Sequence, residues 1–210
     1  MLGITVTRTA NAGVLLEMDG MRILLDGVCD PYPPYLGTPP TLRDTLINDM
    51  PDVLAFTHKH PDHYDSAYET LYKEKTLRLV FGPESLPFYE LLGGIKLSVF
   101  GTRHIGKSDI PHASFVIEGS RTVWFMGDAA PISLKRMTDF KKPDLLIIPF
   151  AYAITPSAWR MTCELGAEKI ILLHMPPKDN DTEGLWSMVN ATVGADERLF
   201  TLDIAETARV

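Results

Sequence analysis

The sequence predicts an α/β fold in which two β-sheets pack face to face and helices cover their outer sides. Apolar segments of strand length alternate along the chain with amphipathic segments of helix length, and this order is typical of sheets covered by helices. The same order occurs twice, over residues 12–81 and over residues 113–173. We therefore expect two similar halves, each supplying one sheet of a single domain that spans residues 1–210.

Each half opens with a β-hairpin. The hairpin turns contain Asp19-Gly20 and Gly119-Ser120, and such pairs provide the positive φ angles that tight turns need. In the first half we expect strands at residues 1–8, 12–17, 22–26, 51–56 and 77–81, and helices near residues 41–49 and 66–75. In the second half we expect strands at residues 96–100, 113–118, 122–126, 143–148 and 169–173, and helices near residues 133–140 and 156–165.

Two local signals add detail to this plan. Ser66 and Glu69 fit a capping box, which predicts that a helix begins there. Residues 30–40 are rich in proline and contain Tyr32 and Tyr35, so they predict a stiff surface loop. This loop could line a pocket or contact a second subunit in a homo-oligomer, and a plain crossover connection is the alternative.

Composition excludes several classes of protein. The 210 residues are 45% hydrophobic, which is enough for a real core, and the formal net charge of -7 does not suit nucleic-acid binding. The apolar stretches are far shorter than the roughly 20 residues that cross a bilayer, and the first residues lack the pattern of a secretion signal. We therefore expect a cytoplasmic protein with no membrane partner. Cys29 and Cys163 predict neither a disulfide nor a thiolate zinc site.

Residues 58–63 are the most informative segment, because they read His-Lys-His-Pro-Asp-His. Imidazole and carboxylate groups suit zinc, iron or manganese, and two such ions side by side can activate water. A histidine-rich surface turn is the alternative. His104, Asp128 and His174 also follow predicted strands, where α/β proteins place their ligands. Taken singly, His104 could be a surface histidine, Asp128 a helix cap and His174 a core histidine. Together with residues 58–63 they predict one metal centre.

This order of residues resembles the metallo-β-lactamase superfamily: a His-x-His-x-Asp-His motif, a later histidine, a Gly-Asp after a strand and a final histidine. The likeness spans nearly the whole chain. It implies a four-layer αββα sandwich of two pseudo-symmetric halves and a site for two metal ions. The ligands that the resemblance implies are His58, His60 and His104 for one ion, Asp62, His63 and His174 for the other, and Asp128 as the bridge between them.

The resemblance also implies an activity. The bridging Asp128 is similar to that of hydrolases and lactonases, and the chain looks like small bacterial proteins around ascorbate-6-phosphate lactonase. Those relatives often carry Gly-His-Ser near the first hairpin, where this chain has Asn11-Ala12-Gly13. We expect a binuclear metal-dependent hydrolase in which a metal-bridging hydroxide cleaves a small, anionic ester, lactone or phosphodiester.

Several alternatives stay open. Zinc is the expected ion, and manganese and iron are the alternatives, because the same ligands accept all three. The alternative functions are an iron-dependent redox enzyme of the same superfamily and a non-catalytic metal-binding protein.

Five residues have expected roles beside the metals. Asp62 could accept a proton as well as hold its ion, and His112 could protonate a leaving group. Arg103 and Tyr152 could contact substrate, and Asp26 could hydrogen-bond a ligand histidine. The alternatives are a solvent-facing histidine for His112, an exposed ion pair for Arg103, a core position for Tyr152 and a turn cap for Asp26.

Overall fold

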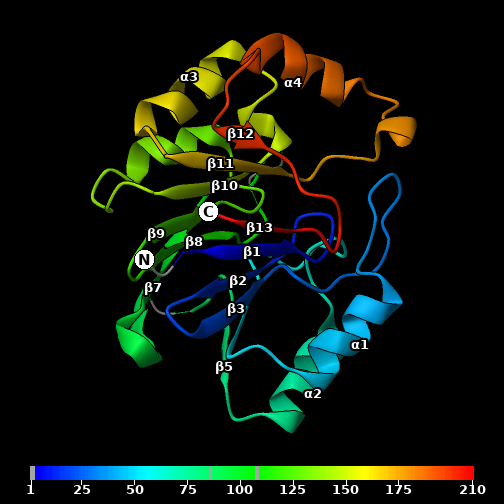
Figure 1. The fold of residues 1–210 in the computed structure, drawn as a ribbon, viewed down its shortest axis with the longest axis vertical. Helices are drawn as coiled ribbons and strands as arrows, with labels where there is room; N and C mark the ends of the chain where they lie inside the picture. The colour runs from blue at the N-terminus through cyan, green and yellow to red at the C-terminus, as the bar shows by residue number, and fades with distance from the viewer. Residues whose placement is uncertain (1–2, 86, 107–108) are drawn as a thin grey trace.

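Two mixed β-sheets lie face to face at the centre of the molecule, as Figure 1 shows for the computed structural model, which describes residues 3–85, 87–106 and 109–210. This arrangement confirms the predicted sandwich. The first sheet has the order β13 (Thr207–Arg209), β1 (Thr5–Arg8), β2 (Val14–Met18), β3 (Met21–Leu25), β4 (Val53–Ala55) and β5 (Leu79–Phe81). The second has the order β12 (Leu199–Phe200), β11 (Lys169–Leu173), β10 (Leu145–Pro149), β9 (Thr122–Phe125), β8 (Ala113–Glu118), β7 (Lys96–Gly101) and β6 (Phe88–Glu90).

Helices form the two outer layers. α1 (Pro40–Asn48) and α2 (Ser66–Lys75) pack on the first sheet, and α3 (Pro156–Leu165) and α4 (Leu185–Val193) lie over the second (Figure 1). The 3₁₀ segments are Leu92–Gly94, Pro131–Arg136, Phe150–Tyr152 and Lys178–Asn180. Within the described residues, no helix is both long and apolar enough to cross a membrane.

Alternation of side chains along the strands explains the four layers. In β2, Val14 and Leu16 pack between the sheets, whereas Leu15 packs in the cluster under α1 and α2. In β9, Phe125 packs between the sheets and Trp124 packs under the helices of the second half. Because both faces are buried, these strands are apolar almost throughout, as in other sheets covered on both sides.

The two halves repeat each other in their hydrogen bonds as well as in their order. The Asp52 carboxylate accepts a bond of 3.0 Å from the backbone N–H of Arg22, where the second hairpin strand begins. The Asp144 carboxylate accepts the equivalent bond of 2.6 Å from the N–H of Thr122. The backbone N–H of each aspartate donates back to the carbonyl of the same partner. The Pro-Asp segments therefore start equivalent strands, as the sequence predicts.

The helix expected near residues 133–140 is a 3₁₀ segment, Pro131–Arg136, so that prediction was wrong. Its bonds run to the residue three positions back, from Ser133 to Ala130 and from Met137 to Leu134. Leu134 and Met137 are both buried, and their spacing of three places them on one side of a helix with three residues per turn. The burial of this pair favours the tighter helix.

The first turn of α2 also differs from its prediction. Asp65, not Ser66, is the N-cap residue, and its carboxylate accepts a bond of 2.9 Å from the N–H of Tyr68. Asp65 has the extended backbone that an N-cap requires, whereas Ser66 is already helical. The strands β6, β12 and β13, the helix α4 and the 3₁₀ segments Leu92–Gly94, Phe150–Tyr152 and Lys178–Asn180 were not predicted. The three strands have only two or three residues each, and β13 forms because it pairs with β1 from the far end of the chain.

Candidate metal centre

The predicted ligands follow the carboxyl ends of strands in both sheets: β4 in the first sheet, and β7, β9 and β11 in the second. β3, β4 and β5 run parallel, as do β9, β10 and β11, so residues that follow them gather at one edge. The backbone turns sharply there, because φ is positive at Asp26 (47°), Gly127 (52°) and His174 (58°). Aspartate and histidine rarely adopt such angles, and strained backbone of this kind concentrates at functional sites. This edge is therefore the natural place for the site.

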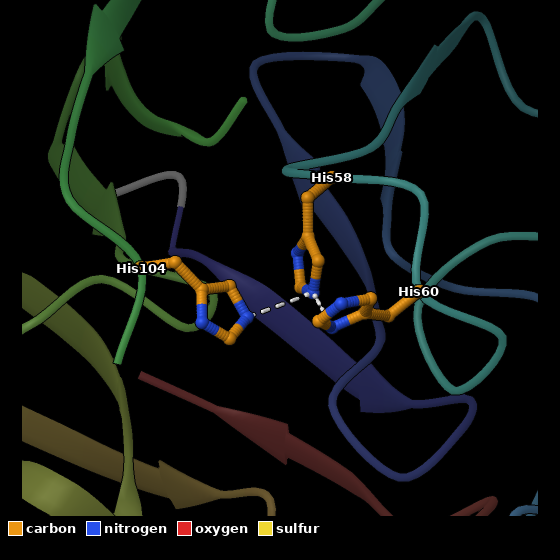
Figure 2. A group of neighbouring side chains, drawn as sticks. All are labelled: His58, His60 and His104. Carbon is orange, nitrogen blue, oxygen red and sulfur yellow. Dashed lines mark hydrogen bonds between the residues drawn. The ribbon is translucent and has the colours of Figure 1, made fainter. Parts of the chain in front are cut away.

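Three histidines form the first group of ligand atoms. His58 and His60 come from the segment after β4, and His104 comes from the segment after β7; Figure 2 shows their rings converging. His58 Nε2 lies 3.0 Å from His60 Nδ1 and 3.3 Å from His104 Nε2. The three ligand atoms all lie within 4.8 Å of one another. This geometry suits one metal ion held by three imidazoles.

A second group lies beside the first and contains Asp62, His63 and His174. His174 Nε2 is 3.1 Å from Asp62 Oδ2, and His63 Nε2 is 3.7 Å from the same oxygen. All three side chains are almost completely buried. This group is also compact enough for one ion, since its ligand atoms lie within 4.8 Å of one another.

The carboxylate of Asp128 stands between the two groups. Its Oδ2 lies 3.5 Å from His104 Nε2, 3.4 Å from His63 Nε2 and 3.5 Å from His174 Nε2. The segment that carries Asp128 pairs with the segment that carries His104, because the N–H of Ile105 donates to the Asp128 carbonyl at 2.8 Å. One carboxylate thus contacts nitrogen atoms of both groups, as a bridging ligand would.

Hydrogen bonds on the outer side of three histidines orient the rings so that the lone pair on Nε2 faces the site. The Asp26 carboxylate accepts bonds from His63 Nδ1 (2.8 Å), the Thr57 hydroxyl (2.7 Å) and the Thr57 N–H (2.6 Å). The Thr57 hydroxyl has donated its only hydrogen, so it accepts from His58 Nδ1 at 3.0 Å. His104 Nδ1 donates to the carbonyl of Ile105. His58, His63 and His104 therefore carry their Nδ1 protons on the outside and turn Nε2 toward the centre.

The charges of the site also suit a cation. Burial alone would raise the pKa of Asp128, but the charges of His174 and His63 outweigh burial and hold this pKa well below its usual value. Burial alone would lower the pKa of His63, but Asp128 and Asp26 raise it well above its usual value. Burial and the neighbouring His63 lower the pKa of His58. His58 is therefore neutral and ready to bind metal, and the Asp128 carboxylate between the two groups is ionised.

Several buried atoms have no hydrogen-bond partner among the described residues. They are His63 Nε2, His174 Nδ1, Asp128 Oδ1 and the side-chain oxygen of Asn11. Buried polar atoms are normally paired, and a group of unpaired ones around a cluster of histidines is typical of a site for an ion. With imidazole and carboxylate donors aimed at two centres, the residues fit a pair of divalent metal ions.

Two other candidate residues, Tyr152 and His112, do not have the positions that their expected roles require. A third, Arg103, lies at the surface beside the site. Tyr152 is fully buried in the core under the helices, and its hydroxyl donates to the Ala130 carbonyl at 3.4 Å, so it does not reach a substrate. His112 is buried with both ring nitrogens hydrogen-bonded, so it neither faces solvent nor has a proton free for a leaving group. Arg103 is exposed next to His104 and forms no ion pair among the described residues.

Three further residues contact the ligands, and the sequence predicted none of these contacts, although Tyr35 lies in the loop that was expected to line a pocket or contact a second subunit. Thr57 bonds Asp26 and His58, and its position directly before the histidine motif is the only signal for it. The side-chain NH₂ of Asn11 donates to Asp62 Oδ2 at 3.4 Å, and the backbone carbonyl of Asn11 accepts from the N–H of His174 at 3.3 Å. Tyr35 packs its ring edge-on against that of His174, with centroids 4.5 Å apart. The loop at residues 30–40 therefore borders the site.

Binding of zinc to metal-free protein near pH 7 is expected to release about one proton, because His63 Nε2 must lose its proton before it can bind the metal. A raised pKa keeps His63 protonated through neutral pH in the metal-free protein, so the apparent zinc affinity should increase as the pH rises. Calorimetric titrations in buffers with different ionisation enthalpies measure the protons released. Zinc affinity that is unchanged between roughly pH 6 and pH 8 would contradict this expectation.

Solved structures with the same fold include two hydrolases and a hydroxylase. An isothiocyanate hydrolase from Delia radicum gut bacteria is 16% identical with a TM-score of 0.69, over 97% of this chain and 98% of that one. Igni18, a metallo hydrolase from the archaeon Ignicoccus hospitalis, is 17% identical with a TM-score of 0.67, over 99% and 98%. CmlA, a diiron β-hydroxylase from Streptomyces venezuelae, is 15% identical with a TM-score of 0.66, over 99% of this chain and 54% of that one.

The family of the chain follows from its sequence as well as from its fold. No curated protein matches the sequence. Residues 5–170, however, match the family described as the beta-lactamase superfamily domain. This match spans most of the chain and agrees with the resemblance carried by the histidine motif, and it supports the predicted class of enzyme, a metal-dependent hydrolase. The chain belongs to the β-lactamase superfamily of metal-dependent proteins.

Proposed function

We propose that this protein is a binuclear metal-dependent hydrolase. The observation that carries the proposal is the place of Asp128, whose Oδ2 lies 3.4–3.5 Å from nitrogen atoms of both groups of histidines. A carboxylate in this place supports two ions held side by side. Zinc is the proposed ion, since it favours imidazole nitrogen together with carboxylate oxygen, and manganese and iron are the alternatives.

Bound divalent ions would supply Lewis acidity and lower the pKa of water toward about 7, which makes hydroxide available near neutral pH. The residues of the chain would hold and orient these groups. Asp128 would keep the two sites close together, and Asp26 would keep His63 in the correct tautomer. Asp62, which is ionised and contacts Asn11, would accept the proton that the attacking water loses.

The side chains around His174 and His104 support our proposal for the kind of substrate. The rings of Tyr35 and Phe150 lie 4.5 Å and 5.6 Å from the His174 ring, so aromatic surface borders the second group. Arg103 is exposed beside His104 and could meet an anionic group. We propose a small molecule with an electrophilic carbon or phosphorus centre: an ester, a lactone or a phosphodiester. The likeness to an isothiocyanate hydrolase adds isothiocyanates to these candidates.

Rates of hydrolysis by zinc-loaded protein, measured for one compound of each class, test the proposal. We expect hydrolysis of at least one class, its loss when a chelator strips the metal, and its return when zinc is added back. A His60→Ala variant should stay inactive after the same addition, because one ligand of the first group is missing. Fully loaded protein that hydrolyses no compound in the panel would contradict the proposal.

Iron-dependent redox chemistry is the second candidate. It is favoured by one observation, the structural likeness to a diiron β-hydroxylase, which has the same fold over its matching half. Histidine and carboxylate ligands accept iron as well as zinc. The two candidates separate on metal content and oxygen: iron retained through purification and oxygen consumed with a reductant would favour the redox enzyme.

A further inference from the structure

His112 is the one histidine that belongs to neither group of ligands. It lies directly before β8, and its side chain is only 4% exposed. Its ring packs behind the first group, with centroids 5.1 Å from His58 and 5.6 Å from His104. Its contacts lead away from the first group and toward the turn that carries Asp128.

Hydrogen bonds link His112 to both ends of the turn formed by residues 126–128. The backbone N–H of Asp128 donates to His112 Nε2 at 3.0 Å. On its other side, His112 Nδ1 lies 2.7 Å from the Thr102 hydroxyl. The Thr102 hydroxyl lies 3.1 Å from that of Ser114, which donates to the carbonyl of Met126 at 3.0 Å. The chain of bonds therefore starts and ends on the same short turn.

The direction of every bond in this chain can be deduced. The Met126 carbonyl only accepts, so Ser114 uses its single hydrogen there and accepts from Thr102. Thr102 has then used its own hydrogen and must accept from His112 Nδ1. Since Nε2 accepts from the Asp128 amide, His112 carries one proton, on Nδ1. A proton on Nε2 would face the hydrogen of that amide.

We propose that His112 is a positioning residue, which acts with Thr102 and Ser114 to hold the turn of residues 126–128 and so to place the Asp128 carboxylate between the two metals. This inference rests on the proposed metal centre but not on the substrate. It also replaces the expected role of His112 as a proton donor, because the single proton of its ring is given to Thr102.

The position of the turn matters because the turn is tightly packed against Thr57. Gly127 has a φ of 52°, and a Cβ atom placed on it would lie 2.5 Å from Thr57 Cγ2. Thr57 in turn bonds Asp26 and His58. A shift of the turn would therefore move Asp128 and press on the residues that orient His58. Without His112, the buried amide of Asp128 would also lose its acceptor.

A long-range ¹H–¹⁵N correlation spectrum of the zinc-loaded protein tests the deduced tautomer. We expect the His112 ring to be protonated on Nδ1 and bare on Nε2 at neutral pH. Nε2 should also couple to the hydrogen-bonded amide of Asp128. A ring protonated on Nε2, or on both nitrogens, would overturn the inference whatever the enzyme hydrolyses.

Zinc titration of stripped protein against a competing chelator tests the positioning role. Since partners behind metal ligands typically account for roughly 10- to 100-fold in metal affinity, His112→Leu should weaken the binding of at least one zinc ion by that factor. His112→Gln should restore most of this affinity, because its amide oxygen can accept from Asp128. Thr102→Val should cause a smaller loss, because His112 Nδ1 would lose its acceptor while Nε2 would still accept from the Asp128 amide.

Thr122→Val is the matched control. Thr122 is fully buried at the start of β9, and its hydroxyl has no partner among the described residues, so this variant should bind zinc as the wild type does. If His112→Leu folds and binds two zinc ions with wild-type affinity, His112 has no positioning role. If the wild type itself binds no metal, the metal centre fails instead, and the same spectrum recorded on the metal-free protein still decides the tautomer.

Discussion

Replacement of Asp128 by asparagine is expected to reduce hydrolysis by roughly 10³-fold or more, because Lewis-acid stabilisation by metal ions is worth several kcal/mol. The substituted side chain would keep the size of the original but lose the charge that faces His63, His104 and His174. Its amide hydrogens would compete with an ion for the lone pairs on these rings. Steady-state rates of the zinc-saturated variant on the best substrate measure the effect.

Asp139→Asn is a control for this variant, since Asp139 is exposed and lies outside the site. It should keep wild-type rates and metal content. Wild-type activity in Asp128→Asn would show that the carboxylate does not bridge catalytic ions. A variant that keeps two ions but has lost activity would instead assign Asp128 to catalysis more than to metal retention.

Replacement of Asp26 by asparagine is expected to weaken the second metal roughly 10- to 100-fold, although Asp26 itself contacts no ion. The carboxylate accepts three buried hydrogen bonds, two from Thr57 and one from His63. An amide has one acceptor, so at least one donor loses its partner at a cost of about 1–3 kcal/mol. If the NH₂ end of the asparagine side chain faces His63, then Nδ1 must accept. The imidazole proton then moves from Nδ1 to Nε2, the atom that would bind metal.

Metal stoichiometry and a thermal unfolding curve together measure this effect. Asp52→Asn is the control, because Asp52 also accepts a backbone hydrogen bond where a strand begins but lies away from the ligands. It should lower stability without changing the zinc content. The role assigned to Asp26 would be wrong if Asp26→Asn bound both ions as tightly as the Asp52→Asn control.

The parts that could be predicted from the sequence depend on local patterns or on repetition. Residues 58–63 combine ligand types at a spacing that few other functions require, and the structure brings those side chains together with His104 and His174. Asp26 could be identified because its hairpin repeats the one that ends in Asp128. The strands were also predictable, since strands buried on both faces read as continuous apolar segments.

The rest depends on contacts between distant parts of the chain. Tyr152 and His112 were both expected to act at the site. Packing buries Tyr152 in the core, and hydrogen bonds join His112 to Asp128. β13 exists because β1 offers an open edge, and its three residues carry little pattern of their own. Asn11 touches Asp62 only because the first turn folds over the site. None of these relations has a local signal.

The metal content of the protein, measured by elemental analysis after purification without added metal, tests the central claim most directly. We expect close to two zinc or manganese ions per chain, or the return of two ions to stripped protein on titration. One iron per chain would move the assignment toward redox chemistry. Protein that holds no ion after purification and takes up none on titration would contradict the metal centre.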